Sequence, residues 1–433
     1  MYVYFVHDLL GMYIMQVSRG QRGIDMNLRL SHQHSIKRPL LVLVLAVGMH
    51  ADGMGSALAQ SSSDPIEVLG WTIEPRASLT VALSPGRDDS AGREAEVVTA
   101  DLKGELQFER VLENGAEIGV WIGGRLQRDH PERAGFSGQI GPNTAIFDGL
   151  APRGAFTGLT LGGVDEDNDV RVQLETGFIY IDGGYGQLLA GRDTGVARRF
   201  HEGAPSVFNL HTVTNARLDT SGIATLLTRN DLTGPAAKIS YASPRLLGLR
   251  LGASYTPRAN VSGVDRDPDL EVSGVNEPRL ENGLEAAFNF RHRFREWGVS
   301  AESYGAYARA ELETGPLRLN TGTVEVWSTG GRLAWDNLEF GADWLTTDNG
   351  AGRYRAWSVG AQSRLFEIDV SGEFGRSFDD ITGIDGRAWS VGASKEFWEK
   401  LTITAGIQRQ ELLSTGLENG ASTGPVLEMT LRY

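Results

Sequence analysis

Apolar and polar residues alternate along most of the chain beyond residue 60. Residues 247–255 read LGLRLGASY and residues 401–408 read LTITAGIQ, with an apolar or aromatic side chain at every second position. Successive side chains of a β-strand point to opposite faces, so this period indicates strands with one apolar and one polar face. No segment of convincing length beyond residue 60 shows the period of an amphipathic helix. The chain is therefore expected to be all-β.

The alternation predicts sixteen strands, and the connections between them are alternately short and long. The expected strands are 71–83, 97–109, 117–128, 171–182, 187–193, 236–243, 247–256, 284–294, 299–311, 323–335, 338–347, 355–366, 368–378, 388–397, 401–412 and 425–433. Short turns are expected at 112–115, 183–186, 243–245, 296–298, 336–337, 367 and 398–400, and the longest polar connections cover 129–170 and 194–235. An even strand number with tight turns at one end and long loops at the other is typical of an outer-membrane barrel.

Alternation alone also fits a soluble β-sandwich or a lipocalin, whose apolar face points inward. The polar face here is rich in Gly, Ser, Thr and charged pairs, as the wall of a wet lumen would be. A closed barrel is the β-structure that can cross lipid, and sixteen strands enclose an aqueous channel. Aromatic residues gather at strand ends and turns, as interfacial girdles require. They are Trp71, Trp297, Trp335, Trp344, Trp357, Trp389, Trp398, Tyr255 and Tyr433.

A repeated heptapeptide fits the same plan. RAWSVGA occurs at 355–361 and again at 387–393, a separation of about one hairpin with its loop. Repeats of this length also occur in solenoids, but the long and uneven loops elsewhere in this chain argue against that architecture.

The N-terminal region has the pattern of an export signal. The longest apolar run, LLVLVLAVGM at 40–49, is half the roughly 20 residues that a membrane-spanning helix needs. Basic residues precede it and Ala57-Leu58-Ala59 follows it, as in a secretory signal peptide. A short buried helix is the alternative. We expect residues 1–59 to be a leader, with the signal peptide at about 26–59 and residues 1–25 explained by a start codon assigned too early. A single barrel domain then covers 60–433.

Composition removes several classes of function. The 433 residues include no cysteine, which excludes disulfides, Cys-ligated zinc or iron–sulfur centres and a thiol nucleophile. The net charge of −14 argues against a nucleic-acid-binding protein, which would carry a basic patch. The 55 glycines are roughly twice the usual share. Turns and a crowded inner wall would account for them.

Three segments resemble the Gram-negative general porin family. YGQLLAGRD at 185–193 is similar to the family's strand before its third loop. Arg229-Asn230, followed by ISYASP at 239–244 and Gly248-Leu249, is similar to the stretch that enters strands six and seven. The C-terminal strand ends on an aromatic residue, here Tyr433 in place of the more usual Phe. In this family the barrel-assembly machinery reads that residue as a signal. The resemblance covers essentially all of 60–433.

The resemblance implies a 16-stranded antiparallel transmembrane β-barrel with short periplasmic turns, long extracellular loops and an inward-folded third loop, 194–235. It implies a homotrimer in the bacterial outer membrane, surrounded by lipid and lipopolysaccharide. Each barrel would form a water-filled channel for passive diffusion of small hydrophilic solutes and ions. No cofactor is expected.

Porins of this family place basic residues on the wall opposite acidic residues on the third loop. By motif Arg192 matches a wall arginine and Arg229 lies near another, whereas strand parity suggests Arg76 and Arg125. The acidic loop candidates are Glu202, Asp219 and Asp231. Opposed charges would create a transverse field that orients solutes and tunes ion selectivity. Arg198, Arg199 and Arg217 share the loop, so its net charge is not negative and the ion selectivity stays open.

The sequence gives little indication of an enzymatic or a metal-binding site. The histidines beyond residue 59 are His130, His201, His211 and His292, and none has metal-ligand spacing. A Ser/His lipase on an outer-membrane barrel is the enzymatic alternative, but the chain has no Gly-x-Ser-x-Gly elbow. The acidic runs 165–169 and 265–269 lack the glycine and glutamate of a calcium loop. At most they would hold Ca²⁺ or Mg²⁺ loosely against lipopolysaccharide, so no catalytic or metal site is expected.

Two other functions are compatible with a barrel of this kind. One is a substrate-selective channel for a sugar or for an anion such as phosphate. The other is a non-conducting adhesin or structural barrel whose lumen is plugged.

Overall fold

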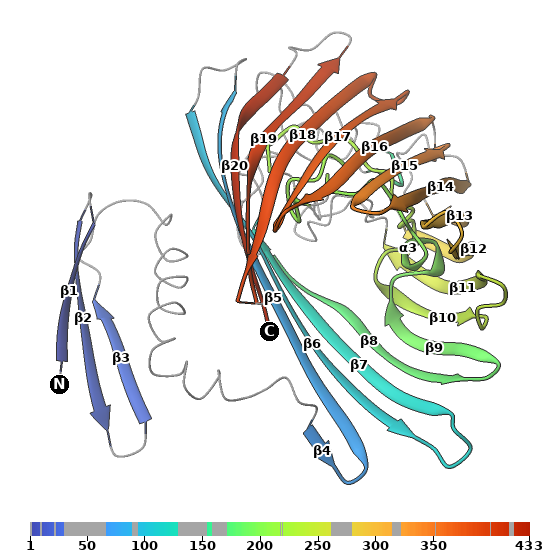
Figure 1. Cartoon of the computed structure of the whole chain (residues 1–433), viewed down its shortest axis with the longest axis horizontal. Coiled ribbons are helices and arrows are strands. Elements are labelled where there is room, and N and C mark those ends of the chain that lie inside the picture. The colour runs from blue at the N-terminus through green and yellow to red at the C-terminus, as the bar shows by residue number, and fades with distance from the viewer. Residues whose placement is uncertain are drawn as a thin grey trace. The chain divides into compact units, whose positions relative to one another are not determined.

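The structure is a computed structural model of the whole chain (Figure 1). It describes residues 66–88, 94–128, 154–157, 171–216, 218, 220–260, 279–313, 322–350, 352–398, 400–414 and 420–433, and the backbone of three strands before them. Those three, β1 (Tyr2–Asp8), β2 (Gly11–Gly20) and β3 (Gly23–Arg29), form an antiparallel sheet within a separate unit, Met1–Asp64. The sequence analysis predicted no strand there. The predicted apolar segment 40–49 lies outside the described residues, so the leader stays a prediction.

The second unit, Pro65–Tyr433, is a closed antiparallel barrel. Its strands are β5 (Trp71–Asp88), β6 (Glu94–Val111), β7 (Glu117–Arg128), β8 (Arg171–Gly183), β9 (Gly186–Asp193), β10 (Ala236–Ala242), β11 (Leu249–Asn260), β12 (Arg279–Phe294), β13 (Val299–Glu313), β14 (Thr323–Trp335), β15 (Leu338–Thr347), β16 (Tyr354–Leu365), β17 (Ile368–Asp379), β18 (Ile384–Phe397), β19 (Leu401–Ser414) and β20 (Gly420–Arg432). Pairing of β20 with β5 closes the ring. A short extra strand, β4 (Ile66–Val68), pairs with the start of β5.

The predicted all-β barrel is confirmed, and each predicted strand overlaps one of β5–β20. The largest differences are at strand ends: β5 continues to Asp88 and β12 begins at Arg279, five residues beyond the predicted bounds in each case. Hydrophobic alternation stops where the strands leave the apolar band, but backbone pairing continues. The sequence pattern therefore shows the membrane-facing part of a strand better than its whole length.

Short turns connect the strands where they were predicted. Between β6 and β7, the Leu112 amide donates to the Ala116 carbonyl at 2.7 Å and the Asn114 side chain accepts from the Ala116 amide at 3.1 Å. Gly115 has φ +80°, a conformation that favours glycine. Most of the other connections, at the opposite end of the barrel, are longer.

The outer surface of the barrel is apolar, with aromatic side chains near its ends. Trp297, Trp335 and Trp398 are exposed at the short turns. Towards the other end, Trp344 and Trp357 are exposed and paired across β15 and β16. This arrangement fits the interfacial girdles predicted for a membrane barrel. Among the described residues, no helix is long and apolar enough to cross a membrane.

Candidate functional site in the lumen

The connection between β9 and β10, residues 194–235, lies inside the barrel, and we call it the lumen loop (Figure 1). It begins with the single turn α3 (Val196–Arg199), whose Val196 amide donates to the Ser254 hydroxyl of β11 at 3.0 Å. It then contacts inward-facing side chains as far round the ring as β20. The inward fold implied by the resemblance is present.

Three buried carboxylates of the wall hold the backbone of the lumen loop. Glu285 of β12 accepts from the Ala197 amide at 3.1 Å. Glu373 of β17 accepts from the Val213 amide at 2.9 Å. Glu428 of β20 accepts from three successive amides, those of residues 209–211, at 2.7–3.0 Å. Carboxylates accept stronger hydrogen bonds than neutral groups, so these three points fix the path of the loop.

Glycines on the inner wall make room for the side chains of the loop. A side-chain carbon at Gly392 or Gly406 would overlap the ring of Phe208, and one at Gly375 would overlap Leu226. Part of the glycine excess therefore belongs to a crowded inner wall, as the sequence analysis expected.

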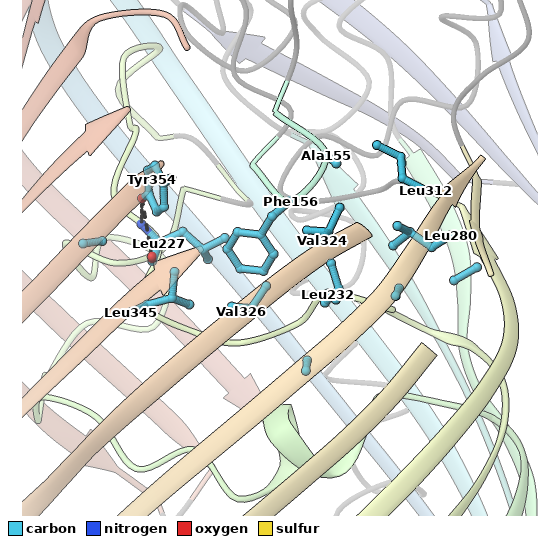
Figure 2. Close-up of a cluster of buried hydrophobic side chains, with 14 of the residues drawn as sticks. Ala155, Phe156, Leu227, Leu232, Leu280, Leu312, Val324, Val326, Leu345 and Tyr354 are labelled. Atoms are coloured by element: carbon cyan, nitrogen blue, oxygen red, sulfur yellow. Dashed lines mark hydrogen bonds between the residues drawn. The ribbon is translucent and has the colours of Figure 1, made fainter. Parts of the chain in front are cut away.

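Apolar side chains pack the loop against one side of the barrel (Figure 2). Leu227 and Leu232 of the loop join Val326 of β14 and Leu345 of β15 in one buried cluster. Phe156, from the described segment 154–157, lies among them and is fully buried. Its backbone amide donates to the Asn349 side chain at 2.8 Å. A second connection of the barrel, the one after β7, thus also reaches the lumen.

Two cationic side chains on the inward face of β6 and β7, Lys103 and Arg125, are less deeply buried than most polar side chains behind the loop. Arg125 of β7 points inward, where its guanidinium contacts Asp101 at 3.0 Å and Glu175 at 3.3 Å. Neighbouring Lys103 of β6 is partly exposed and forms a salt bridge with Glu105 at 2.6 Å. In contrast, the inward polar side chains of β16–β20 are largely buried beneath the loop.

Strand parity placed Arg76 and Arg125 on the inward face, and both are there. The Arg76 guanidinium is paired with Glu74 at 2.9 Å and lies over the ring of Trp121 at 5.6 Å. Arg76 is close to the turn that begins β5, whereas Arg125 is deeper in the barrel.

The prediction that Arg192 lines the lumen is wrong. Arg192 pairs with Ala237 and has the parity of Leu188, which faces outward and is exposed. Its side chain donates to the Leu174 carbonyl on the neighbouring strand at 2.6 Å. The motif located the strand correctly, but the alternation of faces puts this residue outside.

The prediction that Arg229 belongs to the wall is also wrong, because the residue lies on the lumen loop. It does face the lumen, and Arg198 of the same loop is close to it. The Arg198 charge, together with burial, lowers the pKa of Arg229 to about 9. The loop thus carries two neighbouring cations where the family pattern implied acidic residues.

Of the acidic loop candidates, the structure describes Glu202 and Asp231, and these two have different partners. Glu202 pairs with Arg291 of β12 at 3.2 Å. Burial and the nearby Glu302 raise the pKa of Glu202. Asp231 is close enough to Arg229 to stabilise its charge. Asp219 lies outside the described residues, as do the acidic runs 165–169 and 265–269 and the loop residue Arg217.

A polar cavity of about 300 Å³, which we call the loop pocket, lies between the lumen loop and the wall. Its charged lining comprises Arg198, Arg229, Arg332, Asp343 and Glu373. His201 also lines it, and burial together with the three arginine charges lowers the pKa of His201 well below its usual range. The histidine is therefore neutral near pH 7. The remaining lining residues are Gly203, Ala204, Thr212 and Thr214.

The sequence analysis did not single out the wall residues of this pocket. The alternation in β15 indicates that Asp343 points inward, but nothing in the sequence distinguishes it from other inward polar residues. The pocket depends on where the lumen loop lies, and that path is set by contacts between residues far apart in the chain.

The described part of the barrel was compared with the ligand arrangement that a metal ion needs. No group of three or more His, Asp or Glu residues there has the arrangement of a metal site. His292 lies between Phe290 and Phe294, with ring centroids at 6.1 and 4.6 Å.

Comparison with known families identifies the class of protein. The model of the Gram-negative porin family matches residues 53–423, so the chain belongs to that family. It is an outer-membrane β-barrel channel for passive diffusion of solutes. Proteins of this family are channels and not enzymes.

Solved porins have the same fold at low sequence identity. The anion-selective porin of Comamonas acidovorans is 12% identical with a TM-score of 0.51, over 84% of this chain and 100% of that one. OmpF of Salmonella typhi, in a complex with daunomycin, is 12% identical with a TM-score of 0.53, over 85% and 100%. The trimer form of OmpT from Vibrio cholerae is 8% identical with a TM-score of 0.51, over 84% and 100%. No curated protein matches the chain.

Proposed function

We propose that solutes cross the barrel between the lumen loop and the inward face of β6 and β7. The observation that carries this proposal is the unequal covering of the wall. The loop buries the polar residues of β16–β20, but leaves Lys103 and Arg125 partly exposed. A passage of this kind, lined by charged and polar groups, suits small hydrophilic solutes and ions and excludes apolar ones.

The charges beside this passage favour anions. On the loop side Arg198 and Arg229 lie close together, and Arg125 on the wall is near enough to lower the pKa of Arg229 further. The wall cations are balanced by Asp101, Glu105 and Glu175, and the two loop cations lie close enough together for Arg198 to lower the pKa of Arg229. In a low-dielectric channel two adjacent cations of this kind raise the local concentration of anions. The similar fold of an anion-selective porin agrees with this proposal.

Modification of single cysteines tests the path. The chain has no cysteine, so any that is introduced is unique. Ser78 on the inward face of β5 pairs with Lys103, whereas Ser377 of β17 is buried beneath the loop. With Ser78→Cys, a bulky water-soluble methanethiosulfonate reagent should reduce the single-channel current. With Ser377→Cys it should not. Equal block of both variants would place the passage elsewhere.

We also propose how the protein assembles. The trimer form of OmpT supports a homotrimer, which crosslinking in mild detergent would show. Tyr433 directly follows β20 and forms reciprocal backbone hydrogen bonds with Ala77 of β5 at 2.8 and 2.9 Å, so the last residue also helps to close the barrel. We propose that the barrel-assembly machinery reads this terminus and that lipid and lipopolysaccharide surround the barrel. Deleting Tyr433 should then lower the amount of assembled protein in outer membranes. No catalytic activity and no cofactor are proposed.

A further inference from the structure

The loop pocket presents two groups of opposite charge to the same cavity. One is the guanidinium of Arg229 on the lumen loop, and the other is the carboxylate of Glu373 on β17. Each is near enough to influence the other electrostatically. No salt bridge of Arg229 is found among the described residues, although the carboxylates of Asp343 and Asp231 are near enough to stabilise its charge.

The carboxylate of Glu373 is only partly used by the protein. One oxygen, Oε2, accepts from the Val213 amide at 2.9 Å. The other, Oε1, is buried and has no hydrogen-bond partner among the described residues, although the Ser206 hydroxyl is nearby. The residue as a whole is 6% exposed. A buried carboxylate oxygen without a donor is costly, so a donor brought into the cavity would be stabilised there.

The other charged groups of the pocket, Arg198, Arg332 and Asp343, already have partners. Arg332 donates to the Gly203 carbonyl at 2.7 Å and to Glu339 at 3.2 Å. Asp343 accepts from the Ser358 hydroxyl and lies 3.7 Å from the His201 ring. Arg229 and Glu373 are therefore the pair left to bind a ligand, and the ligand must carry a negative and a positive end.

We propose that the loop pocket binds a small zwitterionic solute, an amino acid, with its carboxylate on Arg229 and its ammonium group on Glu373. Guanidinium–carboxylate and ammonium–carboxylate pairs are charge-assisted hydrogen bonds and are strengthened in a cavity shielded from bulk water. The volume of about 300 Å³ equals about ten water molecules. That leaves room for a short amino acid and several waters. The proposal rests on the diffusion pathway proposed above, because the solute reaches the pocket from the lumen.

Equilibrium binding separates this proposal from conduction. Isothermal titration calorimetry on the folded protein in detergent, at pH 8, would compare glycine, β-alanine and 4-aminobutyrate with acetate and with ethylammonium. The three zwitterions vary the separation of the charges. At least one zwitterion should bind about tenfold more tightly than either single-charge compound, because it makes a second charged hydrogen bond. Acetate binding as tightly as every zwitterion would overturn the proposal in favour of a simple anion site. No binding by any compound would also overturn it.

Two variants test which residue of the pocket binds which charged end of the ligand. Glu373→Gln keeps an acceptor for the Val213 amide but removes the charge, so it should reduce zwitterion affinity about tenfold and leave acetate affinity unchanged. Arg229→Gln should weaken both. Arg199→Gln and Glu105→Gln are the matched controls, since neither residue lines the pocket. Zwitterion affinity unchanged in Glu373→Gln would refute the assignment, whatever the cysteine experiment shows about the path.

Discussion

Glu428 is the strongest single attachment of the lumen loop to the wall, and Glu428→Gln is expected to loosen the loop without unfolding the barrel. Its Oε1 accepts from the amides of Leu210 and His211 at 3.0 and 2.7 Å, and its Oε2 accepts from the Asn209 amide at 2.8 Å. The His211 ring lies 2.7 Å from Oε1. The side chain of Glu428 is fully buried, so water does not replace these bonds.

The magnitude follows from the number of acceptors that remain. A glutamine side chain has one oxygen, so it can accept hydrogen bonds either from the Asn209 amide or from the amides of Leu210 and His211. Its NH₂ group then faces the remaining backbone N–H and cannot accept a hydrogen bond from it. Loss of one hydrogen bond to a charged acceptor costs about 1.5–3 kcal/mol. At 1.4 kcal/mol per factor of ten, local opening becomes about ten to a hundred times more frequent.

Hydrogen exchange measures this opening directly. The amides of residues 209–211 should exchange about ten to a hundred times faster in Glu428→Gln, while the β6–β7 strands keep their protection. Open-channel current noise should increase as well. Glu105→Gln is the control, because Glu105 faces the open passage and pairs with Lys103 instead of with the loop. Unchanged protection at 209–211 would show that Glu428 does not hold the loop.

Four further outcomes are expected. Arg229→Gln should shift the reversal potential in a salt gradient towards cation preference; an unchanged potential would contradict a role for the loop cations. Arg192→Ser should leave that potential unchanged, because the residue faces outward, and a shift would contradict its placement. Phe156→Ala should cost about 3–5 kcal/mol, seen as a lower urea midpoint in detergent; a neutral effect would argue against the cluster in Figure 2. Because the pKa of His201 is lowered in the folded state, only the unfolded chain binds a proton on this residue as pH falls below about 6.5, and the folded state loses stability there. His201→Gln should therefore reduce the loss of stability between pH 7 and pH 5. An identical dependence of stability on pH in the variant would refute the role of His201.

The barrel could be predicted from the sequence because lipid imposes a strict two-residue period on every strand. The same parity puts Arg76 and Arg125 on the inward positions of β5 and β7, and their role in the channel stays a prediction. The same alternation shows that Arg192 faces outward, since residues 188, 190 and 192 share one face of β9. The family motif identifies the strand but does not show on which face of the strand its arginine lies.

The path of the lumen loop could not be predicted from the sequence in the same way. Its residues follow no period, and its path is fixed by partners such as Glu428, which is 217 residues from His211 along the chain. The approach of Arg229 to Glu373 arises only after the loop has folded against the wall. A single sequence carries no local signal for such a pair. This is why the pocket was missed while the strands around it were found.

We propose that an open passage that favours anions remains beside the lumen loop. Single-channel recording in planar bilayers, with reversal potentials in a potassium chloride gradient, is the test of this passage. We predict stepwise insertions that conduct ions, with a reversal potential shifted towards the equilibrium potential of chloride. Well-folded protein that inserts without conducting would contradict the open passage, and a clear cation preference would contradict the role of the loop arginines.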